Sequence, residues 1–408
     1  MGVLSDPKGY WADLTRAERG VVASIVGFAV LLFAGLLTGA LSPTYFLFLV
    51  GIAGMYALLS LGLNSQWGFS GLINFSVAAF FGIGAYGTSL MSADSSPIAG
   101  GYLPIVGLFV ALVVAAIIAL AIGIPTLRLR ADYLAIASLG LAEVVRLVVL
   151  NERQITNGSA GVRGIPPFFE GWPVLATLPQ QMPGLVIRPF PGTELVLETP
   201  FWGALLNVVV VMAFVGISYG VLRRAHRSPW GRVLRTIRSD EDLARALGKN
   251  TYGFKMQSFV LGSVIMALAG VFYAHLNLFV SPGDLDPVTT FYVWVAVILG
   301  GSGSNRGALF GGVVIVTIRE GTRFLSGLSG FVLDLGVVAL QFDLSFISSN
   351  VAPLRFLLIG VLIVVLMRYR PQGVLPPQRE LIWPKVVNDP PSKLRSGVRE
   401  TKAGGDDE

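Results

Sequence analysis

Residues 45–92 read YFLFLVGIAGMYALLSLGLNSQWGFSGLINFSVAAFFGIGAYGTSLMS, and they decide the fold because they contain no Asp, Glu, Lys or Arg. A helix needs about 20 apolar residues to cross the hydrocarbon core of a bilayer, which is about 30 Å thick. Residues 45–63 and 71–92 each reach that length, and the polar and glycine-containing segment from Asn64 to Gly71 separates them. This stretch therefore predicts two membrane-spanning helices joined by a break.

The composition extends this interpretation to the whole chain. Of 408 residues, 53% are hydrophobic and 13% are charged, whereas soluble domains devote about a quarter of their residues to charged side chains. An ordinary water-soluble domain is therefore excluded. We predict an all-α, polytopic helical membrane protein with about ten transmembrane helices, near residues 21–41, 45–63, 71–92, 103–124, 134–150, 201–222, 257–279, 288–304, 307–323 and 354–368.

The eighth and ninth of these spans are short and interrupted by polar residues. Glycines 300, 301 and 303 end the first, and Arg319, Glu320 and Arg323 end the second. Together they could form one broken or re-entrant element, which membranes tolerate where it lines a cavity in the protein. Eight or nine spans therefore remain alternatives to ten. Residues 327–350 contain two aspartates and predict an external interfacial helix.

Basic residues in the loops predict the orientation. Residues 223–256 contain nine Lys and Arg side chains, whereas residues 151–200 contain three. Cytoplasmic loops are enriched in these residues, so we expect the first loop inside and the second outside a cell membrane. The terminal segments 1–20 and 371–408 then also lie in the cytoplasm, on either side of a transmembrane domain at 21–370. The Pro- and Gly-containing tail is predicted to be disordered.

Several classes of chemistry are missing from the sequence. The chain has no cysteine and only two histidines, which argues against disulfides, thiolate zinc sites and metal clusters. No Gly-x-x-x-x-Gly-Lys-Ser/Thr phosphate loop or nucleophile elbow is present. We predict no enzyme activity and no metal or cofactor bound by this chain. The basic balance is explained by cytoplasmic loops and does not indicate nucleic acid.

Glu143 and Arg146 are charged residues well inside a predicted span. Each would cost about 2.5 to 3.5 kcal/mol at a helix centre that faced lipid alone, so we expect both to face the helix bundle. They can form a structural ion pair, or they can contact a substrate along its pathway. The sequence leaves both interpretations open.

Asn74 and Ser76 follow Trp67-Gly68-Phe69-Ser70-Gly71, an unusually polar interruption for a membrane stretch. The free N–H groups at a helix N-terminus attract anions such as a carboxylate, so this segment is a candidate substrate site. The alternative is a turn at the membrane edge, followed by close helix packing through Gly82 and Gly84.

The loop after the sixth span predicts two short helices. Residues 230–238 form a basic helix, Asp240, Glu241 and Asp242 place negative charge at the start of the next, and Gly248 ends it as a C-cap. Such a loop can simply maintain the orientation of the chain. A compact helix that ends in small residues can instead dock into a groove on a partner, with its charges setting the register.

Several tracts resemble the permeases of ATP-binding cassette (ABC) importers for branched-chain amino acids, in particular the M-type subunit. The similarity covers roughly residues 45–170 and 225–320. It is carried by the Ala244–Gly248 segment of the loop and by residues 71–75, 78–86, 127–130, 132–137, 143, 145, 146, 156–158, 161 and 164–166.

This resemblance implies half of a translocation pathway that works by alternating access. Its partners would be cytoplasmic ATPase subunits that use ATP, a second permease subunit, an extracytoplasmic solute-binding protein and the lipid bilayer. The ATPase-docking residues would be Asp242, Leu243, Ala244, Arg245, Ala246, Leu247 and Gly248. The pathway residues would be Asn74, Ser76, Glu143 and Arg146.

The sequence also departs from the family pattern. Ser76-Val77 stands where the family commonly has Gly-His, and Asp242-Leu243-Ala244 replaces an acidic-Ala-Ala opening. The external segments 167–200 and 325–352 are longer than the pattern, at the place where a binding protein would touch. Two alternatives follow: a permease for urea or short amides, or an ion-coupled secondary transporter in which Glu143 carries the proton.

Overall fold

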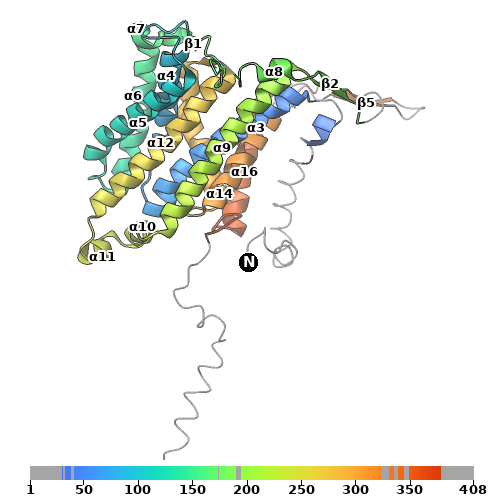
Figure 1. Ribbon diagram of the computed structural model, residues 1–408. Helices are drawn as coiled ribbons and strands as arrows, with labels where there is room; N and C mark the ends of the chain where they lie inside the picture. Colours follow the sequence, from blue (N-terminus) through green and yellow to red (C-terminus); the bar gives the residue numbers. More distant parts are fainter. Residues whose placement is uncertain are drawn as a thin grey trace, which may run out of the picture. The chain divides into compact units, whose positions relative to one another are not determined.

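The computed structural model describes residues 30, 33–37, 41–172, 174–189, 194–322, 330–334, 339–343 and 349–377. The N-terminal segment 1–20, most of the predicted span 21–41 and the tail from residue 378 lie outside this described part. The other nine predicted spans each contain a helix (Figure 1). These helices are α3 (Pro43–Leu63), α4 (Val77–Ser92), α5 (Pro104–Thr126), α6 (Ala131–Asn151), α9 (Thr199–Arg227), α12 (Thr251–Asn277), α13 (Pro287–Gly300), α14 (Asn305–Gly321) and α16 (Val351–Tyr369).

Five of the described helical segments are long and apolar enough to cross a membrane: Pro43–Gly68, Pro104–Thr126, Asp132–Asn151, Thr199–Arg227 and Thr251–Asn277. The all-α membrane class predicted from the sequence is confirmed. The remaining predicted spans correspond to the shorter helices α4, α13 and α14 and to α16, a helix of 19 residues with basic side chains near its end.

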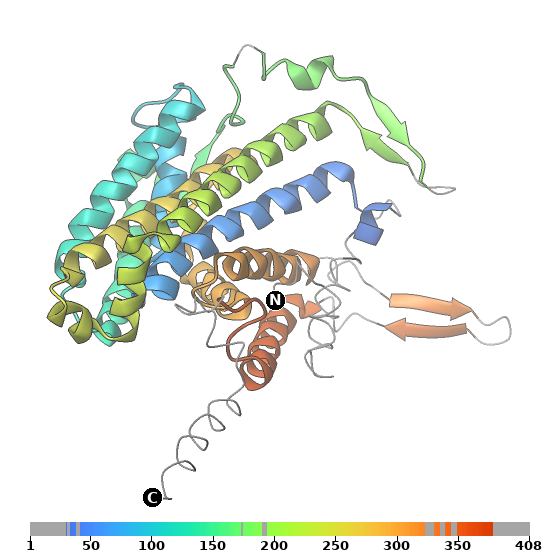
Figure 2. The ribbon, with the colours of Figure 1, turned by 60° about the horizontal axis from the view of Figure 1, so that its bottom comes forward.

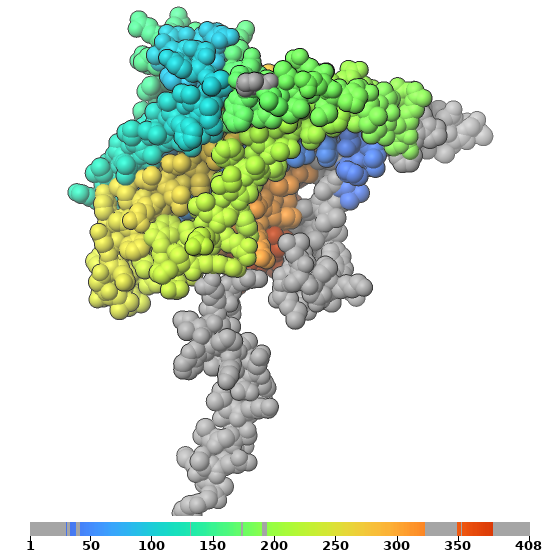
Figure 3. Space-filling model, viewed as in Figure 1, coloured from blue at the N-terminus to red at the C-terminus, as the bar shows by residue number. Residues whose placement is uncertain are grey.

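Helices α3 and α12 form the centre of the bundle. Helix α3 packs against α9, α12 and α14, and α12 packs against α3, α4 and α5. Large buried side chains fill the space between them, such as Tyr56 of α3, Phe80 of α4 and Phe259 of α12. Helices α5, α6 and α9 lie further out and leave apolar side chains exposed. Figure 3 shows α9 as a yellow-green band on the surface.

Glycines allow α4 and α12 to approach closely. A Cβ atom on Gly84 would overlap the carbonyl oxygen of Ala267, and one on Gly270 would overlap that of Phe81. Small residues let membrane helices pack at short range. The interpretation of Gly84 as a packing residue is therefore supported, and Gly82 packs against a different neighbour, because a Cβ there would overlap the side chain of Leu285.

The third predicted span does not begin where the sequence indicated. Helix α3 continues as a short π-helix, η1 (Asn64–Gly68), and residues 71–76 are not helical, so α4 begins only at Val77. Gly71 has φ +74°, in the left-handed region that favours glycine. We call residues 64–76 the polar break. Its non-helical backbone is tolerated because most of its residues are buried in protein rather than in lipid.

Helices α13 and α14 form a hairpin. They pack against each other, and residues 301–304, which we call the glycine turn, join them. Helix α13 has 14 residues, which gives a length of about 21 Å at 1.5 Å per residue and is short of the hydrocarbon thickness. These are two separate helices, and neither is among the segments long and apolar enough to cross a membrane by themselves.

The connections gather at two ends of the bundle (Figures 1 and 2). At one end, β1 (Val162–Arg163) pairs antiparallel with β4 (Phe279–Val280), next to the short helices α7 (Arg153–Thr156) and η2 (Gly158–Ala160). That end also carries η3 (Pro282–Leu285), α8 (Leu178–Gln181) and the hairpin of β2 (Leu185–Ile187) with β3 (Leu195–Leu197). The other end carries α10 (Pro229–Ser239) and α11 (Glu241–Ala246).

The predicted interfacial helix at residues 327–350 is wrong for most of the residues that the structure describes there. Residues 330–334 form β5 and residues 339–343 form β6, which pair antiparallel (Figure 2). Both segments, GFVLD and ALQFD, are rich in aliphatic and aromatic residues and contain one charged residue each, a composition that suits a strand. The two aspartates that argued against a span are the last residues of the two strands.

Candidate functional site

Helices α10 and α11 form the candidate docking element, as the loop composition predicted. Asp240 caps α11: its carboxylate accepts a hydrogen bond from the Leu243 backbone N–H at 2.9 Å. At the other end, Gly248 N–H donates to Arg245 O and Lys249 N–H donates to Ala244 O. With Gly248 at φ +74°, this is the glycine-terminated helix end that the sequence indicated.

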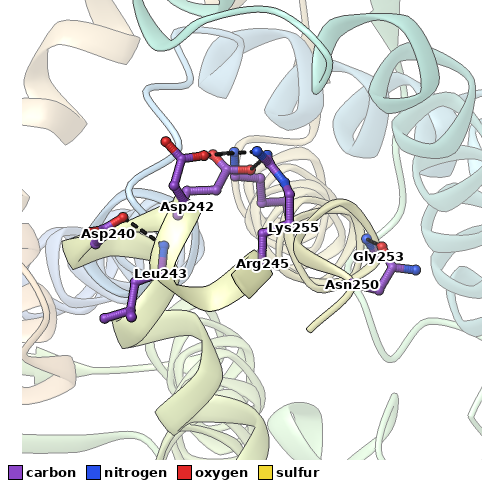
Figure 4. A network of polar contacts seen from close by, with 8 residues as sticks. Asp240, Asp242, Leu243, Arg245, Asn250, Gly253 and Lys255 are labelled. Atoms are coloured by element: carbon purple, nitrogen blue, oxygen red, sulfur yellow. Dashed lines mark hydrogen bonds and ion pairs between the residues drawn. The ribbon is translucent and has the colours of Figure 1, made fainter. Parts of the chain in front are cut away.

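One ion pair joins α11 to the start of α12, and two more lie within α11 (Figure 4). Glu241 pairs with Lys255, and Arg245 reaches Asp242 at 2.9 Å and Glu241 at 3.3 Å. Burial alone would raise the pKa of the Glu241 carboxyl, but its hydrogen bond with Lys255 and the nearby positive charges lower that pKa below its usual value. Asn250 then caps α12 by accepting from the Gly253 N–H at 3.0 Å.

Helix α11 and the residue after it expose two leucines among charged side chains. Leu243 is 51% exposed and Leu247 is 65% exposed, and Ala246 and Gly248 lie beside them on the surface. Ala244 is buried at 1% exposure, so it can support such a surface only from below. The other predicted docking residues, Asp242 and Arg245, are also exposed. The predicted docking residues therefore surround one small apolar surface made by Leu243 and Leu247, which we call the apolar knob.

The polar break forms a buried hydrogen-bond network in the bundle. Asn74 Nδ2 donates to Gln66 Oε1 at 2.7 Å, and Asn74 Oδ1 accepts from the backbone N–H and the hydroxyl of Ser76. Gln66 Nε2 donates to Phe259 O at 2.7 Å and to Ser263 Oγ at 3.2 Å on α12. Asn74 and Ser76 are fully buried, so in this conformation both are occupied in holding the break.

Aromatic rings and a further hydrogen bond fix the same segment to α13. Trp294 Nε1 donates to Asn74 O at 3.1 Å. The Trp294 ring stacks on Phe75, with the centroids 4.8 Å apart, and lies 4.6 Å from the Trp67 ring. Backbone groups in the break lack a partner within a helix, so side chains of neighbouring helices bind them instead. A buried interruption of a membrane helix requires this.

Glu143 and Arg146 form the predicted ion pair within α6. The Arg146 guanidinium donates to both carboxylate oxygens, at 2.5 and 2.9 Å. Their side chains are partly buried, with 39% and 29% of their surface exposed, so the expectation that both face the bundle stays a prediction. The opposite charges of Glu143 and Arg146 offset each other, so the pair can lie at a partly exposed position. The structure does not join it to Asn74 and Ser76 by any hydrogen bond among the described residues.

Sequence reasoning did not single out Gln66, Asn64, Arg238 or Asn305, which all belong to the site. Asn64 Nδ2 donates to Asn305 Oδ1 at 3.0 Å, and Asn64 Oδ1 accepts from the Gly303 N–H at 2.8 Å. For the three amides the available signal was their setting, because they lie in or next to apolar stretches, where an unpaired amide is costly. Among the described residues, no group of three or more His, Asp and Glu side chains could hold a metal ion.

Comparison with known proteins gives this arrangement a family context. The family profile described as "branched-chain amino acid transport system / permease component" matches residues 45–367. The chain is 30% identical over 345 residues to the high-affinity branched-chain amino acid transport system permease protein LivM of Escherichia coli K12, covering 84% of this chain and 71% of that protein.

Two further relatives are similar. The probable branched-chain amino acid transport permease protein LivM of Methanocaldococcus jannaschii is 26% identical over 360 residues, which cover 81% of this chain and 93% of that protein. The permease protein LivH of the Escherichia coli high-affinity branched-chain system is 26% identical over 274 residues, or 65% of this chain and 81% of the relative.

Proposed function

The chain belongs to the branched-chain amino acid transport system permease family, and on that premise we propose that it is a permease subunit of an ABC importer for branched-chain amino acids. Its work is passive: it provides the helices of half the pathway, and partner subunits hydrolyse ATP. The chain itself binds no ATP or other cofactor in this proposal.

The observation that supports this proposal most directly is the exposed apolar knob on α11. Leu243 and Leu247 lie outside the apolar helices and are exposed, although water disfavours such a surface. A short capped helix that presents leucines and small residues fits a groove in a partner. We assign that partner as the cytoplasmic ATPase subunit, with Asp242 and Arg245 setting the register.

The remaining partners follow from the family and from the exposed surfaces. A second permease subunit completes the pathway, and the similarity to both LivM and LivH supports a heterodimer. The connections at the end opposite α11 would meet an extracytoplasmic solute-binding protein. This assignment places both termini in the cytoplasm and the chain in the cell membrane, and lipid would cover the apolar faces of the outer helices.

Alternating access would move the polar break. ATP-driven closure of the ATPases displaces α10 and α11, and the non-helical residues 71–76 are a place where the backbone can change direction. Asn74 and Ser76 are then pathway residues that become accessible when the break opens. Glu143 and Arg146 lie half exposed on α6, so they would line the pathway from the face turned towards a second subunit.

The ion-coupled alternative has less support. A proton-coupling carboxylate must exchange its proton during each cycle, but both oxygens of Glu143 accept hydrogen bonds from Arg146. Transport of urea or a short amide would use the same architecture and differ only in side chains along the pathway. Competition of labelled leucine uptake by urea, acetamide, isoleucine and valine separates these substrates.

The docking assignment can be tested with Leu247→Asp. Because Leu247 is exposed, the substitution leaves the fold intact and places a charge on the knob. We expect the ATPase subunits to stop co-purifying and leucine uptake to be lost. Leu185→Asp is the matched control for co-purification, since Leu185 is 48% exposed at the opposite end of the bundle; we expect the ATPase subunits to co-purify with it normally. Normal co-purification of the Leu247→Asp variant would refute docking through this surface.

A further inference from the structure

The polar break and the glycine turn meet next to the docking element. Asn64 bonds to the Gly303 N–H and to Asn305, the first residue of α14. A Cβ on Gly68 would overlap both Asn64 Oδ1 and the backbone nitrogen of Gly303. The two interruptions of the membrane helices are therefore in direct contact and can move as one unit.

Arg238, in the last turn of α10, reaches both interruptions. Its Nη1 donates to the carbonyl oxygen of Gly68 at the end of the π-helix, and its Nη2 donates to Ser302 Oγ in the glycine turn at 3.1 Å. The aliphatic part of the side chain lies beside Gly71. A guanidinium is planar and presents several donors in fixed directions, so one side chain can hold two backbone segments in register.

The position of Arg238 in the chain connects this clamp to the docking element. Asp240, two residues later, is the N-cap of α11, and α10 and α11 pack against each other. A displacement of α11 therefore acts on Arg238 with little intervening chain. Arg232 is another arginine of α10, and it is exposed like Arg238, so the two carry the same charge at comparable exposure on one helix.

The start of α10 is also connected to the polar break, through the ring of His226. The ring of His226, at the end of α9, stacks on Phe69 with the centroids 3.4 Å apart, and it also stacks on Trp230 of α10 at 5.9 Å. His226 Nδ1 lies 3.2 Å from Asn305 Nδ2. Helix α10 is thus attached to the break at both of its ends and cannot move without displacing it or breaking these contacts.

The interruptions contain the backbone conformations that a moving joint needs. Gly71, Gly301 and Gly303 have φ values of +74°, +109° and +86°, which glycine adopts without the strain a side chain would add. Hinges are a few residues at the ends of elements that absorb changes in φ and ψ. Both glycine-containing segments lie within reach of Arg238.

We infer that Arg238 is a positioning residue that transmits the movement of α10 and α11 to the polar break and the glycine turn, by clamping Gly68 O and Ser302 Oγ together. This inference rests on the proposed function, because it assumes that an ATPase moves α11. The clamp does not bind the ATPase and does not touch the solute. Its loss uncouples transport from ATP hydrolysis without preventing assembly.

The test uses the complete importer in proteoliposomes, with the second permease subunit, the ATPases and the binding protein. Leucine uptake and ATP hydrolysis are measured together, and their ratio reports coupling. For Arg238→Ala we expect hydrolysis near the wild-type rate and about a tenfold fall in leucine moved per ATP, a size typical of coupling between sites. Arg238→Lys keeps the charge but not the planar fork, and we expect about a threefold fall.

Two further variants separate the clamp from general effects of charge and folding. Ser302→Ala removes one arm of the clamp and leaves Arg238 in place, so it is expected to lower the ratio by about threefold. Arg232→Ala removes the same charge from the same helix, and the ratio is expected to stay at the wild-type value. If Arg238→Ala fails to fold, Ser302→Ala decides the question.

Four results would overturn the inference. An unchanged ratio for Arg238→Ala, or for Ser302→Ala, shows that the clamp transmits nothing. An equal fall for Arg232→Ala shows that the charge of α10 matters and not the contact. Loss of the ATPase subunits from Arg238→Ala makes Arg238 a docking residue. If the wild-type complex neither assembles nor imports leucine, the proposed function fails, and the inference fails with it.

Discussion

Helices α3 and α5 are both apolar and long enough to cross a membrane, yet they occupy different places. In the most apolar window of Pro43–Gly68, 72% of the residues are buried, whereas the corresponding share for Pro104–Thr126 is 28%, although the second helix is the more hydrophobic. Helix α3 ends in a polar break and α5 does not. Hydrophobicity therefore predicts which segments enter the membrane, and small and polar residues indicate which lie at the centre.

The sharpest form of this contrast is a pair of glycines. In α4, a Cβ on Gly84 would overlap the Ala267 carbonyl, whereas a Cβ on Gly216 of α9 has no atom within 4 Å. We expect Gly84→Ala to lower the free energy of unfolding by about 3 kcal/mol through overpacking. Gly216→Ala should leave it unchanged or raise it by up to about 1 kcal/mol, because alanine favours helix. Thermal unfolding in detergent measures both, and equal midpoints would remove the distinction.

The next contrast compares two asparagines. Asn74 holds Gln66 and Ser76 in the buried network, whereas Asn207 lies in the outer helix α9 and is only half-buried. Asn74→Leu leaves buried polar partners unpaired, so we expect a loss of about 2 kcal/mol in stability and a loss of leucine uptake with the complex still assembled. Asn207→Leu is the control and should affect neither. Normal uptake by Asn74→Leu would exclude Asn74 from the pathway.

A smaller effect is expected for the ion pair on α6. Glu143→Gln removes the charged partner of Arg146 within a membrane-spanning helix, where an unpaired charge is costly. Because the glutamine amide oxygen can still accept one hydrogen bond from the guanidinium, we expect a loss of about 1 to 2 kcal/mol of stability. Uptake by the assembled importer should remain ATP-dependent. An imposed proton gradient should have the same effect on the variant as on the wild type. If wild-type uptake follows an imposed proton gradient and Glu143→Gln abolishes that response, the ion-coupled interpretation of Glu143 is favoured over the one proposed here.

The smallest expected effect is on the local stability of α11 in the docking element. Hydrogen bonds between uncharged groups hold Asn74 in the buried break, whereas an ion pair holds α11. The pKa of Glu241 is lower in the folded state than its usual value, so its pair with Lys255 stabilises α11 above the ordinary carboxylate pKa of about 4.3. That contribution is lost as the pH falls through the folded-state pKa. Hydrogen exchange of the α11 amides should rise at low pH in wild type more than in Glu241→Gln. An identical pH response would contradict the role of this pair.

Much of the architecture could be predicted because hydrophobic length is a local property of sequence. Nine of the ten predicted spans contain a helix with described bounds, and the described residues 33–37 of the first span are also helical. The acidic start of α11 and its end at Gly248 were readable from residue type alone. The beginning of α4 was misplaced because residues 71–76 are apolar enough for a helix. Only tertiary contacts, such as the Trp294 bond to Asn74 O, stabilise their non-helical backbone.

The site was less predictable for the same reason. The sequence placed Asn74 and Ser76 in a polar interruption, but it did not show that Gln66 and Ser263 would bond there from other elements. Nor did it distinguish the buried Ala244 from the exposed Leu243 next to it. Which face of α6 carries Glu143 depends on how the helix packs, and helical spacing alone leaves that open.

The central claim is that this subunit is passive and is driven from outside itself. The most direct measurement is leucine accumulation in vesicles that contain the permease subunits alone, compared with vesicles that also contain the ATPases, the binding protein and ATP. The account predicts accumulation against a gradient only in the complete system, and its loss when ATP is withheld. Accumulation by the permease subunits alone, under an imposed ion gradient, would contradict it.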